Sequence, residues 1–277
     1  MPFDPPLSID EVQKVFTGTF TILEMLAPGG QGYVFRASGP SESGKSPVSV
    51  ALKIYSEDQA EERSLREVTA LKQLRCERIV RFHAAGSCRV RGTNCRYIAT
   101  EFVEGESLTR AILKSPIAIP YVVRIAIDLA TAIAALWEVR IVHRDVKPAN
   151  VIRVPSGASV LIDLGIARHQ SLSAITTIGK AWGTPGYMSP EQAEAKRSLT
   201  CKSDIFSLGV LLQESLVGRH PTNGQQHLLK DGGVRTERLL KNLPAQLIAM
   251  INAMLNRSAV FRPTPAKVIK ELERLAQ

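Results

Sequence analysis

The sequence predicts an α+β fold in two lobes: an antiparallel β-sheet with one helix forms the first lobe, and the larger second lobe is mostly helical. Strand-like alternation of apolar and polar residues occupies roughly the first hundred of the 277 positions, and helical periodicity dominates the rest. Strands and helices that are segregated along a chain are typical of the α+β class. The sequence contains no internal repeat, so we expect one domain, at 19–277, with lobes at about 19–103 and about 104–277. We expect residues 1–18 to form an extension before this domain.

The elements of the first lobe follow from local patterns. Ser8 is a suitable N-cap for a short helix that ends near Phe16. Period-two alternation, helical periodicity and turn residues then predict, in order, strands at 19–26, 33–38 and 47–55, a helix at about 57–74, and strands near 79–85 and 96–103. The segment VEGES (103–107) is the expected hinge between the lobes.

Composition points to an ordinary globular protein of the cytoplasm. The chain is 44% hydrophobic, and its four cysteines stand at spacings that match no familiar zinc site, so we expect reduced thiols. The N-terminus lacks the basic segment and apolar core of a signal peptide. The most apolar stretch (121–139) carries Arg124 and Asp128 one helical turn apart, which favours a buried helix over a membrane span.

A basic cluster lies at 75–96, with six arginines against the single acid Glu77, and contributes to a net charge of +9. Such a cluster is usually a solvated face. No interleaved aromatic residues or recognised nucleic-acid module accompany it, so we predict no specific nucleic-acid binding. An acidic or phosphorylated partner remains an alternative.

The segment GPSESGKS (39–46) matches the phosphate-binding pattern G-x-x-x-x-G-K-[ST] letter for letter. A loop of that kind must leave a strand and open a helix, because the helix N-terminus holds the phosphate. Here Pro47 and a second strand pattern follow, which predicts the polar tip of a β-hairpin. A P-loop hydrolase that uses Lys45, with VLID (160–163) as its second metal motif, remains the alternative.

A second glycine cluster, LAPGGQGYVFRA (26–37), lies between two predicted strands. Its three glycines at 29, 30 and 32 would let the hairpin backbone approach a phosphate closely. On the strand after the next turn, Ala51 and Lys53 share the face opposite Val50, Leu52 and Ile54. In the following helix Glu67 borders an apolar stripe and needs a cationic partner, for which Lys53 is the nearest candidate.

The segment IVHRDVKPANVIRVPSGASVLIDLG (141–165) carries the most specific chemistry. Two short strands, at 151–154 and 159–162, flank the turn PSGA, with Asn150 just before the first and Asp163 just after the second. In an antiparallel hairpin these positions lie side by side, about 5 Å apart. An amide oxygen and a carboxylate suit Mg²⁺, which takes its remaining ligands from phosphate and water. Asp145 and Lys147 lie on the loop that leads to the same place.

These motifs together resemble a eukaryotic-type (Hanks-type) protein serine/threonine kinase catalytic domain, from about Phe20 to Leu275 and closest to its bacterial branch. The resemblance implies a bilobal protein-kinase-like fold and an ATP-dependent enzyme that transfers γ-phosphate to Ser/Thr hydroxyls of protein substrates. In HRDVKPAN it makes Asp145 the group that accepts the substrate proton, Lys147 a clamp on the γ-phosphate and Asn150 a Mg²⁺ ligand. In DLG it makes Asp163 the second Mg²⁺ ligand.

Further roles come from the same resemblance. Lys53 of VALK, paired with Glu67, binds the α and β phosphates of ATP, and Thr100 is the gatekeeper before the adenine-binding hinge. The implied nucleotide-binding residues are Leu26, Ala27, Gly29, Gly30, Gly32, Val34, Ala51, Lys53, Glu101 and Val103. In the second lobe the resemblance predicts Thr184 near the catalytic aspartate, a Glu191–Arg262 ion pair, and a buried helix at 203–214 whose Asp204 braces the catalytic loop.

The chain departs from the family pattern at two positions. Ala27 replaces the first glycine of the usual G-x-G-x-x-G, and Leu164 replaces the phenylalanine of DFG. Arg144 beside the catalytic aspartate indicates activation by a phosphate on Thr176 or Thr177, with Ser171 and Ser173 behind them, through self-association and autophosphorylation. A pseudokinase-like binding scaffold is the alternative function, but Lys53, Asp145, Asn150 and Asp163 are all present.

Overall fold

The structure, a computed structural model, describes residues 5–29, 32–40, 46–56, 72, 74–163, 183–196 and 198–275. The chain divides into two compact units. Within the described residues, the strand unit contains the positions up to 72 and Val80–Phe102, and the helical unit contains Leu74–Ile79 and everything from Val103 onward.

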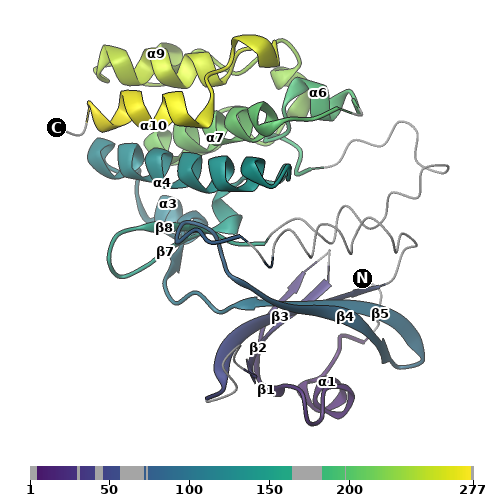
Figure 1. Cartoon of the computed structure of the whole chain (residues 1–277). Helices are drawn as coiled ribbons and strands as arrows, with labels where there is room; N and C mark the ends of the chain where they lie inside the picture. Colours follow the sequence, from purple (N-terminus) through teal and green to yellow (C-terminus); the bar gives the residue numbers. More distant parts are fainter. Residues whose placement is uncertain are drawn as a thin grey trace. The chain divides into compact units, whose positions relative to one another are not determined.

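The strand unit is built on a five-stranded antiparallel sheet, as predicted (Figure 1). Its strand order is β1-β2-β3-β5-β4. The strands are β1 (Thr21–Gly29), β2 (Gly32–Gly39), β3 (Val48–Ser56), β4 (Phe82–Val90) and β5 (Thr93–Glu101). Gly32 is required at the start of β2, because its φ is +135° and an added Cβ would lie 2.5 Å from the carbonyl oxygen of Ile54.

One face of this sheet is covered by the N-terminal segment. Helix α1 (Ile9–Val15) begins at a capping box, in which Ser8 and Glu11 satisfy each other's backbone N–H groups, and ends at the C-cap Phe16, as predicted. The segment buries its apolar side chains in the same core as those of the sheet: Leu7, Val12, Phe16, Phe20, Tyr33, Phe35, Val50, Leu52, Ile54 and Ala99. The predicted domain boundary at 18/19 stays a prediction, but residues 7–16 contribute directly to the core of the strand unit.

Strands β4 and β5 differ from the prediction, which ended the first strand at 85 and began the second at 96. They form one hairpin, closed by a two-residue turn at Arg91 and Gly92. Both turn residues have positive φ, 48° and 79°, as a type I′ turn requires. The usual Asn-Gly signal is absent because arginine takes the first position, and the arginines around this turn hid the strand pattern.

The P-loop-like segment lies at a hairpin, as predicted. Gly39 of β2 pairs with Val48 of β3, so a strand and not a helix follows the motif. Lys45 itself lies outside the described residues. The described residues therefore lack the helix that a phosphate-binding P-loop needs at this place.

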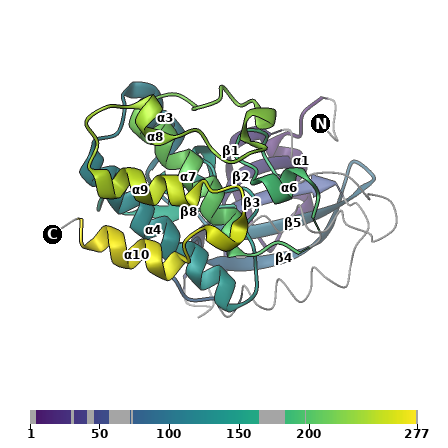
Figure 2. The ribbon, with the colours of Figure 1, turned by 90° about the horizontal axis from the view of Figure 1, so that it is seen from above.

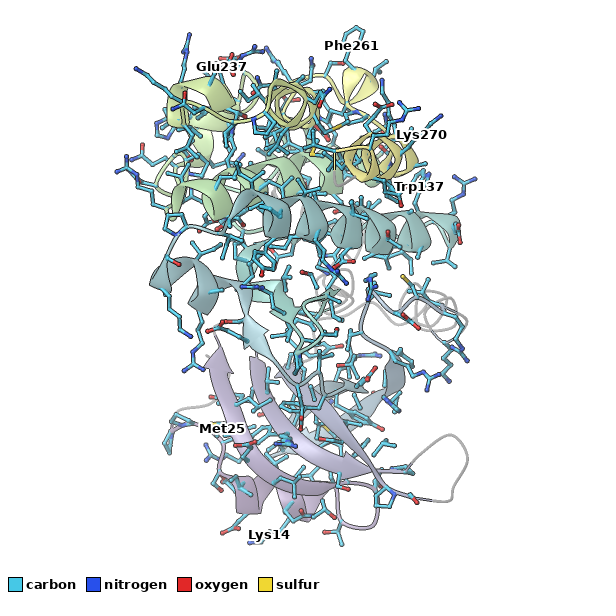
Figure 3. All side chains as sticks on the ribbon, turned by 90° about the vertical axis from the view of Figure 1, so that its left-hand side faces the viewer. Lys14, Met25, Trp137, Glu237, Phe261 and Lys270 are labelled. Carbon is cyan, nitrogen blue, oxygen red and sulfur yellow. The ribbon has the colours of Figure 1, made fainter. Side chains whose placement is uncertain are left out.

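The helical unit packs long helices around α7 (Cys201–Val217). Helix α4 (Ile119–Glu138) contacts both α7 and α10 (Pro265–Glu273), and Figure 2 shows α4 and α10 side by side. Figure 3 labels Trp137 on α4 and Lys270 on α10. The other elements are β6 (Glu106–Ser107), α3 (Leu108–Lys114), η1 (Pro148–Asn150), β7 (Val151–Arg153), β8 (Ser159–Leu161), α6 (Pro190–Ala193), η2 (Gln226–Leu229), α8 (Thr236–Leu239), α9 (Ala245–Met254) and η3 (Ala259–Phe261).

Helix α4 is long and apolar enough to cross a membrane by length and composition, but more than half of its most apolar window is buried inside the protein. Its Asp128 is also buried: it accepts a hydrogen bond from Ser159 N at 2.8 Å and lies 2.8 Å from Arg78 Nε. Burial raises the pKa of Asp128, although Ser159 and Arg78 oppose that shift. The sequence pattern indicates that Arg124 lies one helical turn from Asp128. The ion-pair partner of Asp128 in the structure is Arg78, one of the six arginines of the basic cluster.

Candidate active site

The loop between α4 and β7 brings three of the predicted residues together. Asp145 and Asn150 are only 3% and 7% exposed. The short helix η1 places Asn150 so that its Nδ2 donates to Asp145 O at 2.8 Å and to Asp145 Oδ2 at 3.0 Å. Lys147 Nζ lies 3.0 Å from the same Oδ2. One carboxylate oxygen is thus held by an amide and an ammonium group.

The second oxygen of Asp145 is held by Thr184. Thr184 donates to Oδ1 from its backbone N at 3.1 Å and from its Oγ1 at 2.6 Å, which confirms that Thr184 lies beside the predicted catalytic aspartate. Lys147 Nζ donates to the same Thr184 Oγ1 at 2.6 Å. The carboxylate, the ammonium and the hydroxyl therefore form one closed network.

Asp204 fixes the backbone just before Asp145, as predicted. It lies fully buried in the first turn of α7, where its two oxygens accept hydrogen bonds from His143 N and Arg144 N, both at 2.8 Å. Burial raises the pKa of Asp204, and the two backbone donors and nearby positive charge counter that effect. Arg144 has a positive φ of 66°, a conformation that few non-glycine residues adopt, so this brace holds a strained turn.

The β7–β8 hairpin forms as predicted, but its register differs by one residue. Val151 pairs with Leu161, and Ile162 N donates to Asn150 O at 2.8 Å. Asn150 therefore lies opposite Ile162, and Asp163 follows one residue beyond the pair instead of directly opposite Asn150. The reason is that the turn is one residue shorter than predicted, since Val154 N donates to Ala158 O across residues 155–157. Strand β8 ends at Leu161, and the backbone at Asp163 has φ 60°.

The chemistry of these two side chains fits a hard divalent cation. Because the Nδ2 of Asn150 is directed to Asp145, its amide oxygen is the group that remains to bind a cation. Asp163 adds a carboxylate. Within the described ranges no group of three or more His, Cys, Asp or Glu side chains is arranged to hold a metal, so any cation here would take its other ligands from phosphate and water.

Glu191 and Arg262 form the predicted ion pair. The two Nη atoms of Arg262 donate to the two carboxylate oxygens at 2.6 and 2.8 Å, and Ser203 Oγ donates to Glu191 Oε1 at 2.7 Å. Burial raises the pKa of Glu191, but the hydrogen bonds and charge of Arg262 outweigh burial and lower that pKa from 4.5 to about 2. The pair is buried and charged at neutral pH.

Gln192 has a role that sequence reasoning missed. Its Nε2 donates to Arg144 O at 3.0 Å, and its Oε1 accepts from the N and Oγ of Ser189. The spacing Ser189-x-x-Gln192 is a capping-box pattern with proline at the first helical position, so the start of α6 was visible in the sequence. The hydrogen bond from Gln192 to the carbonyl of Arg144 in the catalytic loop was not visible in the sequence.

In the strand unit, ladder pairing places several predicted nucleotide-binding residues on one face of the sheet. Ala27 pairs with Val34, Val34 with Lys53, and Lys53 with Ile98. Because directly paired residues share a face, the side chains of Val34 and Lys53, and that of Ala51 two positions from Lys53, lie on the face opposite the buried core. Gly29 pairs with Gly32 at the end of the β1–β2 hairpin.

Three other predicted nucleotide-binding residues lie outside this regular ladder pairing. Leu26 stands at a register shift of β1, between the paired Met25 and Ala27, and is exposed. Glu101 ends β5, where its backbone N donates to Arg81 O at 2.8 Å, and Val103 is the residue at which the chain passes from the strand unit back into the helical unit. Their roles with a nucleotide remain predictions.

Several predicted residues lie outside the described part of the chain. They are Gly30, Glu67, Leu164, Ser171, Ser173, Thr176 and Thr177. The Lys53–Glu67 pair and the activation phosphosites therefore stay predictions.

Comparisons with known proteins agree with this geometry. The protein kinase domain family matches residues 20–272. The serine/threonine-protein kinase AfsK of Streptomyces coelicolor is 34% identical over 92% of this chain and 32% of its own length. The probable serine/threonine-protein kinase PkwA of Thermomonospora curvata is 31% identical over 92% of this chain and 34% of its own length.

A probable serine/threonine-protein kinase of Clostridium perfringens is 28% identical over 95% of this chain and 39% of its own length. The chain thus spans about a third of the length of these curated relatives. Because the family match covers nearly the whole chain and these relatives are bacterial, the chain belongs to the protein kinase domain family, in its bacterial serine/threonine kinase branch.

Proposed function

We propose that this chain is an ATP-dependent protein kinase that transfers the γ-phosphate to serine or threonine hydroxyls of protein substrates. The single observation that carries the proposal is the network around Asp145, in which Lys147, Asn150 and Thr184 hold one buried carboxylate. A carboxylate fixed at both oxygens is well placed to orient a hydroxyl and to accept its proton.

In the proposed step the substrate hydroxyl oxygen forms a bond to the γ-phosphorus while the bond between that phosphorus and the bridging oxygen of ADP breaks. The hydroxyl proton passes to Asp145. Lys147, which bridges Asp145 and Thr184, would place its positive charge beside the transferring phosphoryl group. Positioning and electrostatics thus supply the rate, without a covalent intermediate.

Members of the family use ATP and a divalent cation, and we propose Mg²⁺ here. Asn150 and Asp163 would hold it, since they offer an amide oxygen and a carboxylate. When bound, the ion would neutralise charge on the β and γ phosphates. In the strand unit, Lys53 would bind the α and β phosphates and the Gly29–Gly32 hairpin would offer its backbone amides to the phosphates.

Regulation and cellular context are further proposals. Arg144 would receive a phosphate placed on Thr176 or Thr177, and self-association would allow that autophosphorylation. A cytoplasmic location of the catalytic domain stays a prediction from the sequence. The protein substrates are those of the whole protein, of which this chain can be one part.

Transfer of labelled phosphate from ATP to a generic basic protein, in the presence of Mg²⁺, tests the proposal. We expect Asp145→Asn to lower the transfer rate at least about a hundredfold, because proton transfer to a positioned base contributes about that much, while ATP binding is largely kept. Lys45→Ala is the matched control for the P-loop alternative and should transfer phosphate at the wild-type rate.

Two results would contradict the proposal. A wild-type chain that binds ATP but transfers no phosphate would favour the binding-scaffold alternative. Loss of nucleotide binding in Lys45→Ala, with Asp145→Asn unaffected, would favour a P-loop hydrolase.

A further inference from the structure

The segment Gly183–Met188 adjoins the proposed catalytic carboxylate. Thr184 of this segment holds Asp145 Oδ1 through both its backbone N and its hydroxyl. If Asp145 is the catalytic base, as the proposed function has it, an acceptor hydroxyl that reaches it must bring its own polypeptide alongside this segment. The residues that hold the segment in place therefore bear on how the acceptor binds.

Side chains, and not a β-ladder, hold the backbone of this segment. The amide of Gln226, at the start of η2, makes two bonds: its Oε1 accepts from Gly186 N and its Nε2 donates to Met188 O, both at 2.8 Å. Ser207 Oγ on α7 donates to Tyr187 O at 2.7 Å. One glutamine thus satisfies polar groups on either side of Tyr187, as a neighbouring strand would.

His220 holds a further group of this segment, the carbonyl of Gly186. Its Nδ1 accepts from Thr222 N at 3.1 Å and from Gly224 N at 2.9 Å. Because both of these partners are donors, Nδ1 carries no proton, and the proton on Nε2 is donated to Gly186 O at 3.1 Å. Burial lowers the pKa of His220, in keeping with this neutral form.

The contact between the two loops is close at Gly186. Its φ is +90°, and an added Cβ would lie 2.8 Å from Gly224 Cα and 2.9 Å from His220 Nε2. The His220 ring also packs edge-on against Tyr187, with ring centroids 4.8 Å apart. The loop that carries His220 and Gln226 therefore fits directly against the segment, and a change in either side chain is transmitted to it.

We propose that His220 and Gln226 are positioning residues for the protein acceptor. They hold the backbone of Gly183–Met188 in the form that receives the polypeptide around the acceptor hydroxyl. In this role they set the apparent affinity for the acceptor and leave the affinity for ATP unchanged, because their contacts are to Gly186 and Met188 and not to the residues proposed for ATP and Mg²⁺.

Steady-state kinetics with a protein acceptor separates this role from a general structural one. Gln226→Glu replaces the donor to Met188 O by a carboxylate oxygen that faces a carbonyl. We expect KM for the acceptor to rise about tenfold, with KM for ATP and the melting temperature unchanged. Gln225→Glu is the matched control: it is the same substitution one residue earlier, at an exposed position, and should behave as wild type.

Two replacements of His220 separate its two sets of contacts. His220→Gln extends an amide donor to Gly186 O but loses the acceptor for Thr222 and Gly224, whereas His220→Asn keeps that acceptor and cannot reach Gly186 O. We expect a lower acceptor KM for His220→Gln than for His220→Asn. If Gln226→Glu lowers the melting temperature relative to Gln225→Glu, the order of acceptor KM values in the two His220 variants decides whether the positioning role holds.

The outcomes are distinguishable. Equal acceptor KM values for Gln226→Glu and Gln225→Glu, or the reverse order for the two His220 variants, in an active enzyme would overturn the positioning role alone. A wild-type chain that transfers no phosphate would overturn the proposed function instead.

Discussion

Among the residues that the structure describes, Arg262 is the largest fully buried side chain. Besides its two bonds to Glu191, it donates to the backbone carbonyls of Asn256, Lys202 and Arg257. It also lies over the ring of Phe206, 4.9 Å from the ring centroid. Five donors in a rigid fork explain why arginine suits this site: every hydrogen bond that replaces water is made by the protein.

Removing one partner should be costly, because the other charge then stays buried without its counter-charge. Glu191→Gln leaves a buried guanidinium without its counter-charge, so we expect the free energy of unfolding to fall by about 3–5 kcal/mol, measured by urea denaturation at pH 7. The control is Glu194→Gln, which breaks an exposed ion pair with Lys196 and should cost no more than about 1 kcal/mol. An equal loss of unfolding free energy in Glu191→Gln and Glu194→Gln would contradict the assignment of Glu191 and Arg262 as a buried, charged pair.

The same pair predicts an acid dependence. The pKa of Glu191 falls from 4.5 to about 2 on folding, so its stabilising effect is complete above pH 4.5 and is lost as the pH falls towards 2. The difference in unfolding free energy between the wild type and Glu191→Gln should therefore shrink between those two pH values. A difference that stays constant down to pH 2 would show that folding does not lower the pKa of Glu191.

At the scale of elements, α1 is the clearest addition to the family pattern. The family match begins at residue 20, yet α1 and its flanks supply core side chains to the strand unit. Arg91, in the β4–β5 turn, ties this segment down through hydrogen bonds to both carboxylate oxygens of Glu11, at 2.7 and 2.8 Å, and to the carbonyls of Pro5 and Pro6. The hydrogen bonds of Glu11 with Arg91, together with those from the backbone N and the hydroxyl of Ser8, lower the pKa of Glu11 to about 2.

Phe16 tests whether α1 supports the sheet. It is 4% exposed and packs edge-on against Tyr97 of β5, with ring centroids 5.0 Å apart. We expect Phe16→Ala to lower the free energy of unfolding of the strand unit by about 3–5 kcal/mol, since it removes a buried ring and leaves a cavity. Lys14→Ala, on the exposed side of the same helix, should change it by less than about 0.5 kcal/mol.

Hydrogen exchange of β1 and β5 amides reports this effect locally. Exchange in Phe16→Ala should be faster in these strands than in Lys14→Ala. Identical protection of these amides in both variants would mean that packing of α1 does not stabilise the sheet.

For the whole molecule, sequence reasoning predicted what local patterns and short motifs determine. The antiparallel sheet, the α1 cap, the β7–β8 hairpin, the bond of Thr184 to Asp145 and the bonds of Asp204 to the backbone before Asp145 all follow from residues inside recognisable motifs. The type I′ turn at Arg91 was missed because its residues carry no usual turn signal.

Contacts between residues that lie far apart in the chain and outside the family motifs were the least predictable. The Arg78–Asp128 ion pair and the His220–Gly186 bond join positions 50 and 34 residues apart, from 128 − 78 and 220 − 186. The side chains involved are common on protein surfaces, so only folding shows that they meet. The role proposed for His220 and Gln226 was invisible in the sequence for the same reason.

The most direct test of the central claim is the rate of phosphate transfer from ATP as a function of Mg²⁺ concentration. We expect no transfer after chelation of divalent cations, and Asp163→Asn should lose most of the rate and need more Mg²⁺, because it removes the proposed carboxylate ligand. Asp231→Asn, at an exposed carboxylate, should match the wild type. Full transfer with the cation chelated, or an unchanged Mg²⁺ requirement in Asp163→Asn, would contradict a kinase that holds its metal at Asn150 and Asp163.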